Sequence, residues 1–150
     1  MTAHSEDLEH FLHDNIPLAV AMRVRVVHAG RDEVRLSAPL TVNGNHHGTL
    51  FGGSASALAI LCAWSWLHVR LSEEGLDPGV VIQRSSMEFL VPGRSEVVAR
   101  CPGCGEEDWK HFLATYRRFG KARIELGAKI LDGDEAVATL TGTFVALAEL

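Results

Sequence analysis

Hydrophobic side chains recur along this chain with two periods, one typical of helices and one typical of strands. In residues 5–15 they lie at helical spacing, and Pro17 ends that segment. In residues 22–26 and 34–38 they alternate with polar residues, as in the strands of a hairpin that turns at 30–32. The beginning of the chain therefore predicts one helix followed by a β-hairpin.

The longest apolar segment runs from Gly48 to Val69 and contains no Asp, Glu, Lys or Arg. Its strongly apolar part, residues 55–67, is shorter than the ~20 residues of a membrane span, which favours a buried core helix and no membrane partner. The helix is expected to end at Gly75. Because apolar side chains occupy all its sides, we expect the protein to enclose it completely.

The second half of the chain is expected to be mostly β-structure. Strands are predicted at 81–90, 95–101, 122–130 and 136–147, with a short amphipathic helix at 109–116. Alternation within the first of these strands places Val81, Gln83 and Ser85 on one face.

This order of elements predicts an α+β fold in which a curved antiparallel sheet wraps around a long central helix. A chain of 150 residues fits one domain, residues 1–150. One sheet cannot cover both such a helix and its own outer face. We therefore expect a homodimer, or two such dimers paired as a homotetramer.

Composition narrows the classes of partner and the compartment. The net charge of −5 argues against a nucleic-acid surface. Three cysteines cannot all pair, and the start of the chain is unlike a secretory leader, so we expect a cytoplasmic protein. Cys101 and Cys104 form a lone C-x-x-C pair without further ligands, and we expect neither a metal nor a cofactor.

Three stretches of sequence carry a resemblance to a known family. They are NGNHHGTLFGGS at 43–54, VIQRS with FLVP within 81–92, and Trp109 and Phe112 followed by GKARI at 120–124. Together they resemble the YiiD C-terminal family over about residues 17–147. That family comprises hot-dog-fold proteins called thioesterases mainly from their fold. The resemblance therefore implies a hot-dog fold and a hydrolase that acts on acyl-CoA or another acyl thioester.

On this resemblance, the chemistry is expected in the polar loop before the central helix and in the first turn of that helix. Free N–H groups and the dipole at a helix N-terminus suit a developing oxyanion, so Gly53 is assigned to the thioester carbonyl. Asn45 and His47 are the candidates for positioning or deprotonating water. The candidate substrate-binding residues are Asn43, His46, Thr49, Gly52, Ser54, Gln83 and Ser85. The same glycines also suit close helix packing, and the asparagines suit a turn.

The sequence departs from many hot-dog thioesterases at two positions. Those enzymes carry a histidine directly before the Gly-Gly pair and a carboxylate about two turns along the helix. Here Phe51 fills the first position, and the second falls near Ile60. A general base would then come from the loop or from the partner subunit, and the alternative function is an acyl-thioester-binding module without catalysis. A dehydratase ranks third, because the helix lacks an acidic residue.

A basic cluster follows the predicted short helix. It consists of Arg117, Arg118, Lys121 and Arg123. It is either a solvated surface or a site for the phosphates of coenzyme A.

Overall fold

The computed structural model of the chain describes residues 3–150. Its helices are α1 (Ala3–Asn15), α2 (Pro17–Ala21), α3 (Leu40–Asn43), α4 (Gly52–Glu73) and α5 (Glu106–Phe119). Its strands are β1 (Arg25–Ala29), β2 (Val34–Ala38), β3 (Gly79–Phe89), β4 (Val97–Cys101), β5 (Lys121–Asp132) and β6 (Glu135–Leu147). Every predicted helix and strand has a counterpart, and α2 and α3 are additional.

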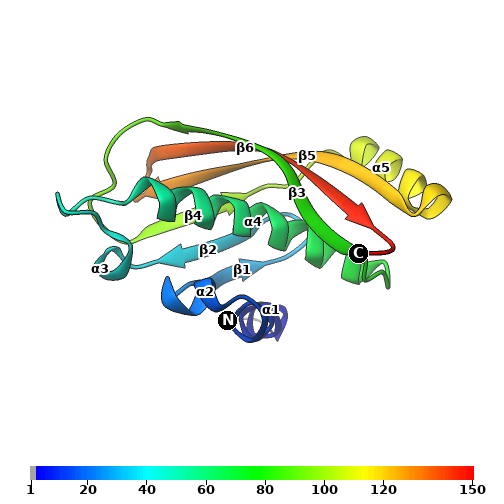
Figure 1. Cartoon of the computed structure of the whole chain (residues 1–150), viewed down its shortest axis with the longest axis horizontal. Helices are drawn as coiled ribbons and strands as arrows, with labels where there is room; N and C mark the ends of the chain where they lie inside the picture. The colour runs from blue at the N-terminus through cyan, green and yellow to red at the C-terminus, as the bar shows by residue number, and fades with distance from the viewer. Residues whose placement is uncertain (1–2) are drawn as a thin grey trace.

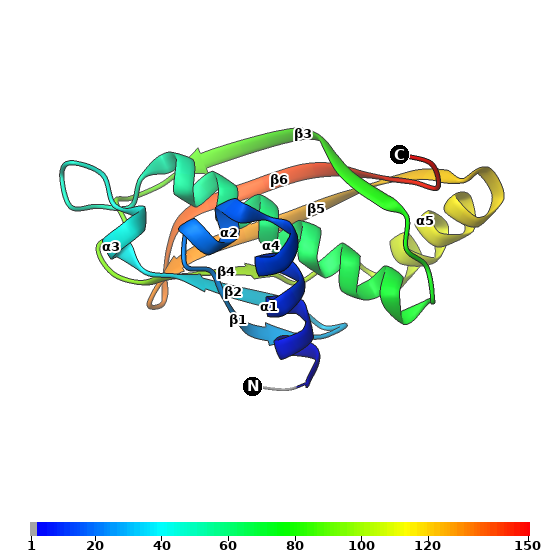
Figure 2. The same ribbon diagram turned by 60° about the horizontal axis from the view of Figure 1, so that its bottom comes forward.

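The six strands form one antiparallel sheet in the order β1-β2-β4-β5-β6-β3. The sheet curves around α4, with α3 at one end of the molecule and α5 at the other (Figure 1). Helices α1 and α2 lie beside α4 near the β1 edge (Figure 2). This arrangement confirms the predicted α+β architecture of a curved sheet around a central helix.

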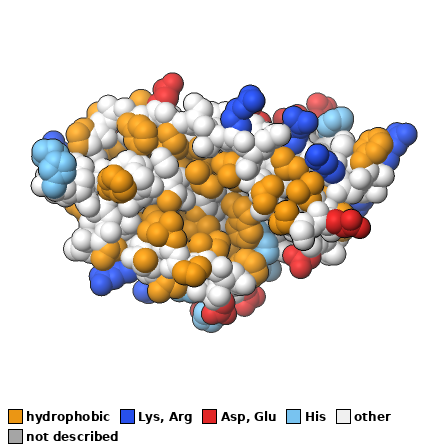
Figure 3. Space-filling view, viewed as in Figure 1, with side chains coloured by type: hydrophobic (Ala, Val, Ile, Leu, Met, Phe, Trp, Pro, Cys, Tyr) orange, Lys and Arg blue, Asp and Glu red, His pale blue; other side chains and the backbone are white. Residues whose placement is uncertain are grey.

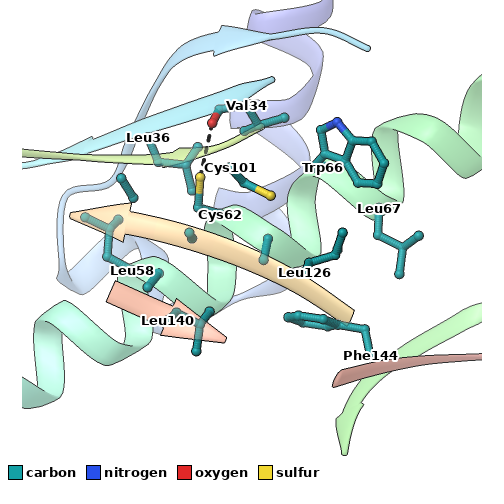
Figure 4. Packing of buried hydrophobic residues seen from close by; sticks show 14 of the residues in the cluster. Val34, Leu36, Leu58, Cys62, Trp66, Leu67, Cys101, Leu126, Leu140 and Phe144 are labelled. Atoms are coloured by element: carbon teal, nitrogen blue, oxygen red, sulfur yellow. Dashed lines mark hydrogen bonds between the residues drawn. The ribbon is translucent and has the colours of Figure 1, made fainter. Parts of the chain in front are cut away.

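The face of α4 that meets the sheet forms the centre of the core. Leu58, Cys62 and Trp66 are at most 1% exposed, and Figure 4 shows them among side chains that come from β2, β4, β5 and β6. Each large apolar side chain buried in this way contributes about 1.5–3 kcal/mol. By length and hydropathy α4 could also cross a membrane, but 56% of that window is buried within the chain. In this structure α4 is a core helix.

The opposite face of α4 remains open in the single chain, so the expected complete enclosure of this helix depends on a second copy. Ala57, Ile60, Leu61 and Trp64 are only half-buried. With residues of α2 and β3 they line an apolar hollow of about 290 Å³. Hydrophobic side chains gather over the middle of this face (Figure 3). No segment in the described part of the chain covers this hollow.

The N-terminal segment differs from its prediction around Pro17. Helix α1 does end at Asn15, but Pro17 then starts α2, because proline is well suited to the first turn of a helix. Strand β1 consequently begins at Arg25 and not at Met22. Arg23, which has a positive φ of 55°, turns the chain between α2 and β1.

A bulge in β3 changes which of its side chains share a face. The register slips between Ile82 and Arg84, so that Ile82 pairs with Phe144 and Ser85 pairs with Gly142. Strict alternation would place Ile82 and Ser85 on opposite faces, but their partners are two residues apart on β6 and therefore face the same way. The predicted common face of Val81 and Ser85 is wrong for this reason.

Helix α5 packs against the end of α4 through a buried arginine. Arg70 is 3% exposed, and its guanidinium carbon lies 4.4 Å from the ring centroid of Trp109 and 5.3 Å from that of Trp66. Its charge is paired with Glu106 at 3.6 Å. Cation–π contacts of this kind strengthen when they are desolvated, so they join the two helices.

His68 makes the stability of the fold depend on pH. Its ring stacks on Phe11 and Trp64, with centroids 4.5 and 5.0 Å away, and burial lowers its pKa from the ordinary 6.5. The unfolded chain therefore binds more protons below pH 6.5, and stability falls as the pH decreases. Urea unfolding between pH 7.5 and 5.5 should show a weaker dependence in His68→Phe, which keeps the stack. Equal dependences in the two proteins would contradict this assignment.

Candidate functional site

The loop between α3 and α4 is tied to the rest of the protein by backbone hydrogen bonds. The Phe51 amide donates to the Asn43 carbonyl at 2.8 Å, and the Leu50 amide donates to the Gly93 carbonyl at 2.8 Å. Within the loop, the Asn45 amide donates to the Thr49 carbonyl at 2.7 Å. These bonds fix the position at which α4 begins, directly after Phe51.

The first turn of α4 presents three amides without an acceptor. The first bond of the helix runs from the Ala55 amide to the Phe51 carbonyl at 3.0 Å. Among the described residues, no acceptor is found for the amides of Gly52, Gly53 and Ser54, and Phe51 supplies no side-chain cap. Such amides, together with the helix dipole, form a site that favours a negatively charged oxygen.

An apolar cavity lies directly beside this helix end. Its volume is about 380 Å³. The cavity, called the α4 pocket below, is lined by Thr49, Leu50, Gly52, Ala55, Phe89, Leu90, Val91, Pro92, Gly93, Val137 and Ala138. No ionisable side chain is among these residues, and Thr49 contributes the one polar side chain. The α4 pocket therefore offers space for an apolar group and donors for an oxyanion, without an acid or a base of its own.

The two glycines meet this pocket differently. Gly52 lines it, and a Cβ added there would lie 3.4 Å from the Phe89 ring. A Cβ on Gly53 would clash with the Phe51 ring, although Gly53 itself is exposed. The structure thus places Gly52 at the pocket wall and Gly53 beside Phe51 outside the pocket lining, whereas the sequence analysis assigned the thioester carbonyl to Gly53.

Asn43 is buried and holds the chain beneath the loop. It is 2% exposed, and its amide nitrogen donates to the carbonyls of Met22 at 2.9 Å and Pro39 at 2.8 Å. Both of its N–H groups are therefore used within the fold. The structure gives Asn43 a role in positioning the loop.

Removing the Asn43 amide should destabilise the protein. Asn43→Ala would leave the Met22 carbonyl without the side-chain donor, and a buried unsatisfied group costs about 1–3 kcal/mol. Urea unfolding should show a loss in that range. Asn15→Ala is the matched control, because Asn15 is an exposed asparagine with one bond to a carbonyl, and we expect about 0.5 kcal/mol at most. Equal losses in both variants would contradict the proposed role of Asn43.

Asn45 and Thr49 are bonded to each other across the loop. The Asn45 carbonyl oxygen accepts from the amides of His47 at 2.9 Å and Thr49 at 3.1 Å, while the two side chains lie within hydrogen-bond distance at 2.9 Å. This is the bonding of an asparagine-based turn. Asn45 thus shapes the loop, and through Thr49 it is connected to the α4 pocket.

His46 and His47 lie at the exposed tip of the loop. Their rings contact each other with centroids 3.8 Å apart, and neither lines the α4 pocket. Although they do not line the α4 pocket, His46 and His47 are the ionisable side chains that directly follow Asn45 in the loop.

The two candidates on β3 lie away from the α4 pocket. Ser85 is four residues before Phe89, or about 14 Å along the strand. Gln83 lines a different cavity, near α5. Within one chain, the structure therefore brings together Thr49, Gly52 and the first turn of α4, and Gln83 and Ser85 lie apart from them. The two β3 residues were expected near the loop of a partner subunit, and that expectation stays a prediction. The sequence missed the segment from Phe89 to Gly93, whose Pro92-Gly93 turn was the available signal.

The cysteines do not form a reactive centre. All three are free, and burial raises the pKa of Cys101 to about 11 and that of Cys62 well above its ordinary range. Cys62 donates to the Val34 carbonyl at 3.2 Å within the core (Figure 4). Thiols that stay protonated at neutral pH are poor nucleophiles.

Comparisons with known proteins agree on both sequence and fold. Residues 5–148 match the family described as "putative thioesterase (yiiD_Cterm)". A protein of unknown function from Chlorobaculum tepidum is 27% identical, with a TM-score of 0.90 over 95% of this chain and 93% of that one. A Shewanella oneidensis protein described as a putative thioesterase is 22% identical, with a TM-score of 0.89 over 98% and 99%. The Escherichia coli PaaI protein, from the phenylacetic acid degradation operon, is 15% identical, with a TM-score of 0.69 over 96% and 94%.

Proposed function

Because this chain belongs to the YiiD C-terminal family of thioesterase-like proteins and has the hot-dog fold, we propose that it hydrolyses acyl thioesters of the acyl-CoA type. The reaction is placed in the α4 pocket, at the interface of a homodimer. The observation that carries the proposal is the row of acceptor-free amides at Gly52, Gly53 and Ser54, beside a cavity with apolar walls.

This geometry matches the needs of thioester hydrolysis at the carbonyl. The carbonyl oxygen becomes negative as water attacks, and amides already in place stabilise it without reorganisation. The apolar walls from Phe89 to Val91 suit the acyl group and exclude bulk water. A low dielectric strengthens the interaction between the amides and the oxyanion.

The water is proposed to be activated by a group that reaches the pocket from its rim. The loop supplies His47, and the partner subunit supplies a second source of side chains. Thr49, held by Asn45, is placed to orient the water or the substrate.

The proposed dimer is formed by pairing of β3 with the same strand of a second copy. Strand β3 is at the edge of the sheet, and an unprotected edge strand is a template for another strand. Its exposed apolar residues include Val81, Ile82 and Phe89. A two-fold axis across β3 would also bring a second surface towards the open face of α4, where the apolar hollow lies.

Hydrolysis of a panel of acyl-CoAs, followed by release of the free thiol, tests this function. The wild-type protein should release thiol, and His47→Ala should lower kcat about a hundredfold if His47 is the base. His46→Ala is the matched control, since its ring is the neighbour of His47 and should be dispensable. Equal rates for all three proteins would exclude His47 from the mechanism.

The same assay separates catalysis from binding. If acyl-CoA raises the melting temperature of the protein and no thiol is released at any chain length, the protein is an acyl-thioester-binding module. That outcome would contradict the proposed hydrolysis.

A further inference from the structure

A second cavity lies at the opposite end of the molecule from the α3–α4 loop. It has a volume of about 530 Å³ and lies between α5 and the strands β3, β5 and β6. Its polar lining includes Lys121, Arg123, His111 and Gln83, and Phe119 forms an aromatic wall. We call it the basic pocket.

The cations of the basic pocket have no partner within the chain. Across residues 3–150, neither Lys121 nor Arg123 makes a side-chain hydrogen bond or an ion pair. By contrast, Arg100 and Arg117 are each paired with a glutamate. In a protein with a net charge of −5, two unpaired cations at the wall of one cavity offer a binding site for an anion.

Phe119 adds a second element of recognition. It is 68% exposed, which is unusual for a phenylalanine, and the guanidinium carbon of Arg118 lies 5.0 Å from its ring centroid. An exposed aromatic ring beside cations suits a planar base attached to phosphates, because base and ring can stack.

From these contacts we propose that the basic pocket binds the phosphorylated adenosine end of an acyl-CoA, and that it serves the α4 pocket of the other subunit. This inference rests on the proposed function, since it concerns the carrier of the acyl group. Lys121 and Arg123 bind the phosphates, and Phe119 stacks on the adenine.

Distance argues that the two pockets of one chain cannot hold one substrate. Arg123 pairs with Val145, which also pairs with Val81, so Arg123 lies eight residues along the sheet from the row of Phe89. Eight residues span about 27 Å. An extended pantetheine arm covers about 15 Å from sulfur to the first phosphate, at the ~1.2 Å advance per bond of an extended peptide. The pantetheine arm is therefore too short to connect the α4 pocket with the basic pocket of the same chain.

Pairing of β3 across the two-fold axis shortens this distance. With the axis near Arg84, the middle of β3, the partner's Val81 lies opposite Met87. The partner's Arg123 is then about 7 Å along the sheet and about 15 Å across it from Phe89, or about 17 Å in all, a span that the arm and the Arg123 side chain cover together. Strand β3 ends at Phe89, and the chain turns away at Pro92-Gly93. The arm can therefore pass the end of β3 to the exposed face of the sheet, where Arg123 lies.

Steady-state kinetics on two substrates with the same acyl group test the basic pocket. The double variant Lys121→Gln/Arg123→Gln should raise KM for acyl-CoA at least tenfold and leave kcat within about twofold. Its KM for the acyl-N-acetylcysteamine thioester, which has no phosphate, should be unchanged. Lys129→Gln is the matched control, because Lys129 is an exposed lysine on the same face of β5 outside the basic pocket.

Several results would overturn the proposal. The basic pocket is not the phosphate site if KM rises equally for both substrates, if KM for acyl-CoA does not rise, or if Lys129→Gln has an equal effect.

If the wild-type protein hydrolyses neither substrate, the proposed function fails. Calorimetry with adenosine 3′,5′-bisphosphate then tests whether the basic pocket binds phosphates, independently of hydrolysis. Wild type should then bind it at least tenfold more tightly than the double variant, and equal or absent binding rejects the site.

Mixing two variants tests whether the pocket acts across the dimer. One variant carries Gly52→Pro, which removes an amide of the α4 pocket, and the other carries Lys121→Gln/Arg123→Gln. A mixed dimer has one intact site if the two pockets belong to different subunits, and none if they belong to the same subunit. We expect that mixing the two variants restores hydrolysis of acyl-CoA with the low KM of the wild-type protein. If activity stays at the average of the two variants after subunit exchange, the trans arrangement is wrong.

Discussion

Gly52→Pro is expected to lower kcat for thioester hydrolysis about 10²–10³-fold, because it removes one amide donor from the site of the oxyanion. Proline fits this position without breaking the helix. Gly52 is the first residue of α4, where the missing N–H costs no helical bond. Phe51 before it has φ −67° and ψ 130°, which is the conformation that a residue before proline prefers.

Gly52→Ala is the matched control for this prediction. It adds a Cβ at 3.4 Å from the Phe89 ring, an ordinary contact, and it keeps the amide proton. The rate difference between the proline and alanine variants therefore reports the donor, while circular dichroism checks that both remain folded. If the two variants hydrolyse acyl-CoA at the same rate, the Gly52 amide does not contact the carbonyl, and the site has to be placed at another group.

Trp66→Ala is expected to produce the largest loss of stability, about 3–5 kcal/mol. The side chain is fully buried, and its Nε1 donates to the Arg31 carbonyl at 3.1 Å. Its ring makes an edge contact with Trp109, with centroids 5.8 Å apart at 79°. Truncation would thus leave a cavity between α4 and α5 and an unpaired carbonyl at the β1–β2 turn.

Urea unfolding measured by circular dichroism tests this prediction. The midpoint should fall while the slope stays constant, since the surface exposed on unfolding is nearly the same. Phe119→Ala is the control, because that ring is largely exposed and its removal should change stability by about 0.5 kcal/mol or less. A loss below about 1 kcal/mol in Trp66→Ala would mean that Trp66 does not anchor the core.

The fold was largely predictable because its signals are local. The strongly apolar segment at 55–67 predicts α4, and the regular alternation in 122–130 predicts β5. Errors arose where a local rule has two outcomes. Pro17 can end one helix or begin the next, and alternation in β3 holds only until a bulge at Ile82–Arg84 shifts it.

The candidate site was predictable in its location but not in the roles of its residues. Asn45 belongs to the loop as expected, whereas Asn43 is the last residue of α3. Their side-chain amides bond to Thr49 and to the Met22 carbonyl respectively, partners that the sequence does not specify. The wall from Phe89 to Gly93 reaches the α4 pocket only because β3 returns beside the start of α4.

The sequence by itself determined a curved sheet around one apolar helix, a polar loop before that helix, and the family to which the chain belongs. Hydrophobic periodicity and short motifs carry this information, since each depends on neighbours in the chain. Only the tertiary structure decided that Gly52 borders the α4 pocket, that no ionisable side chain lines it, and that Lys121 and Arg123 lie unpaired at a second cavity. Those properties depend on segments far apart in sequence, whose packing no local pattern encodes.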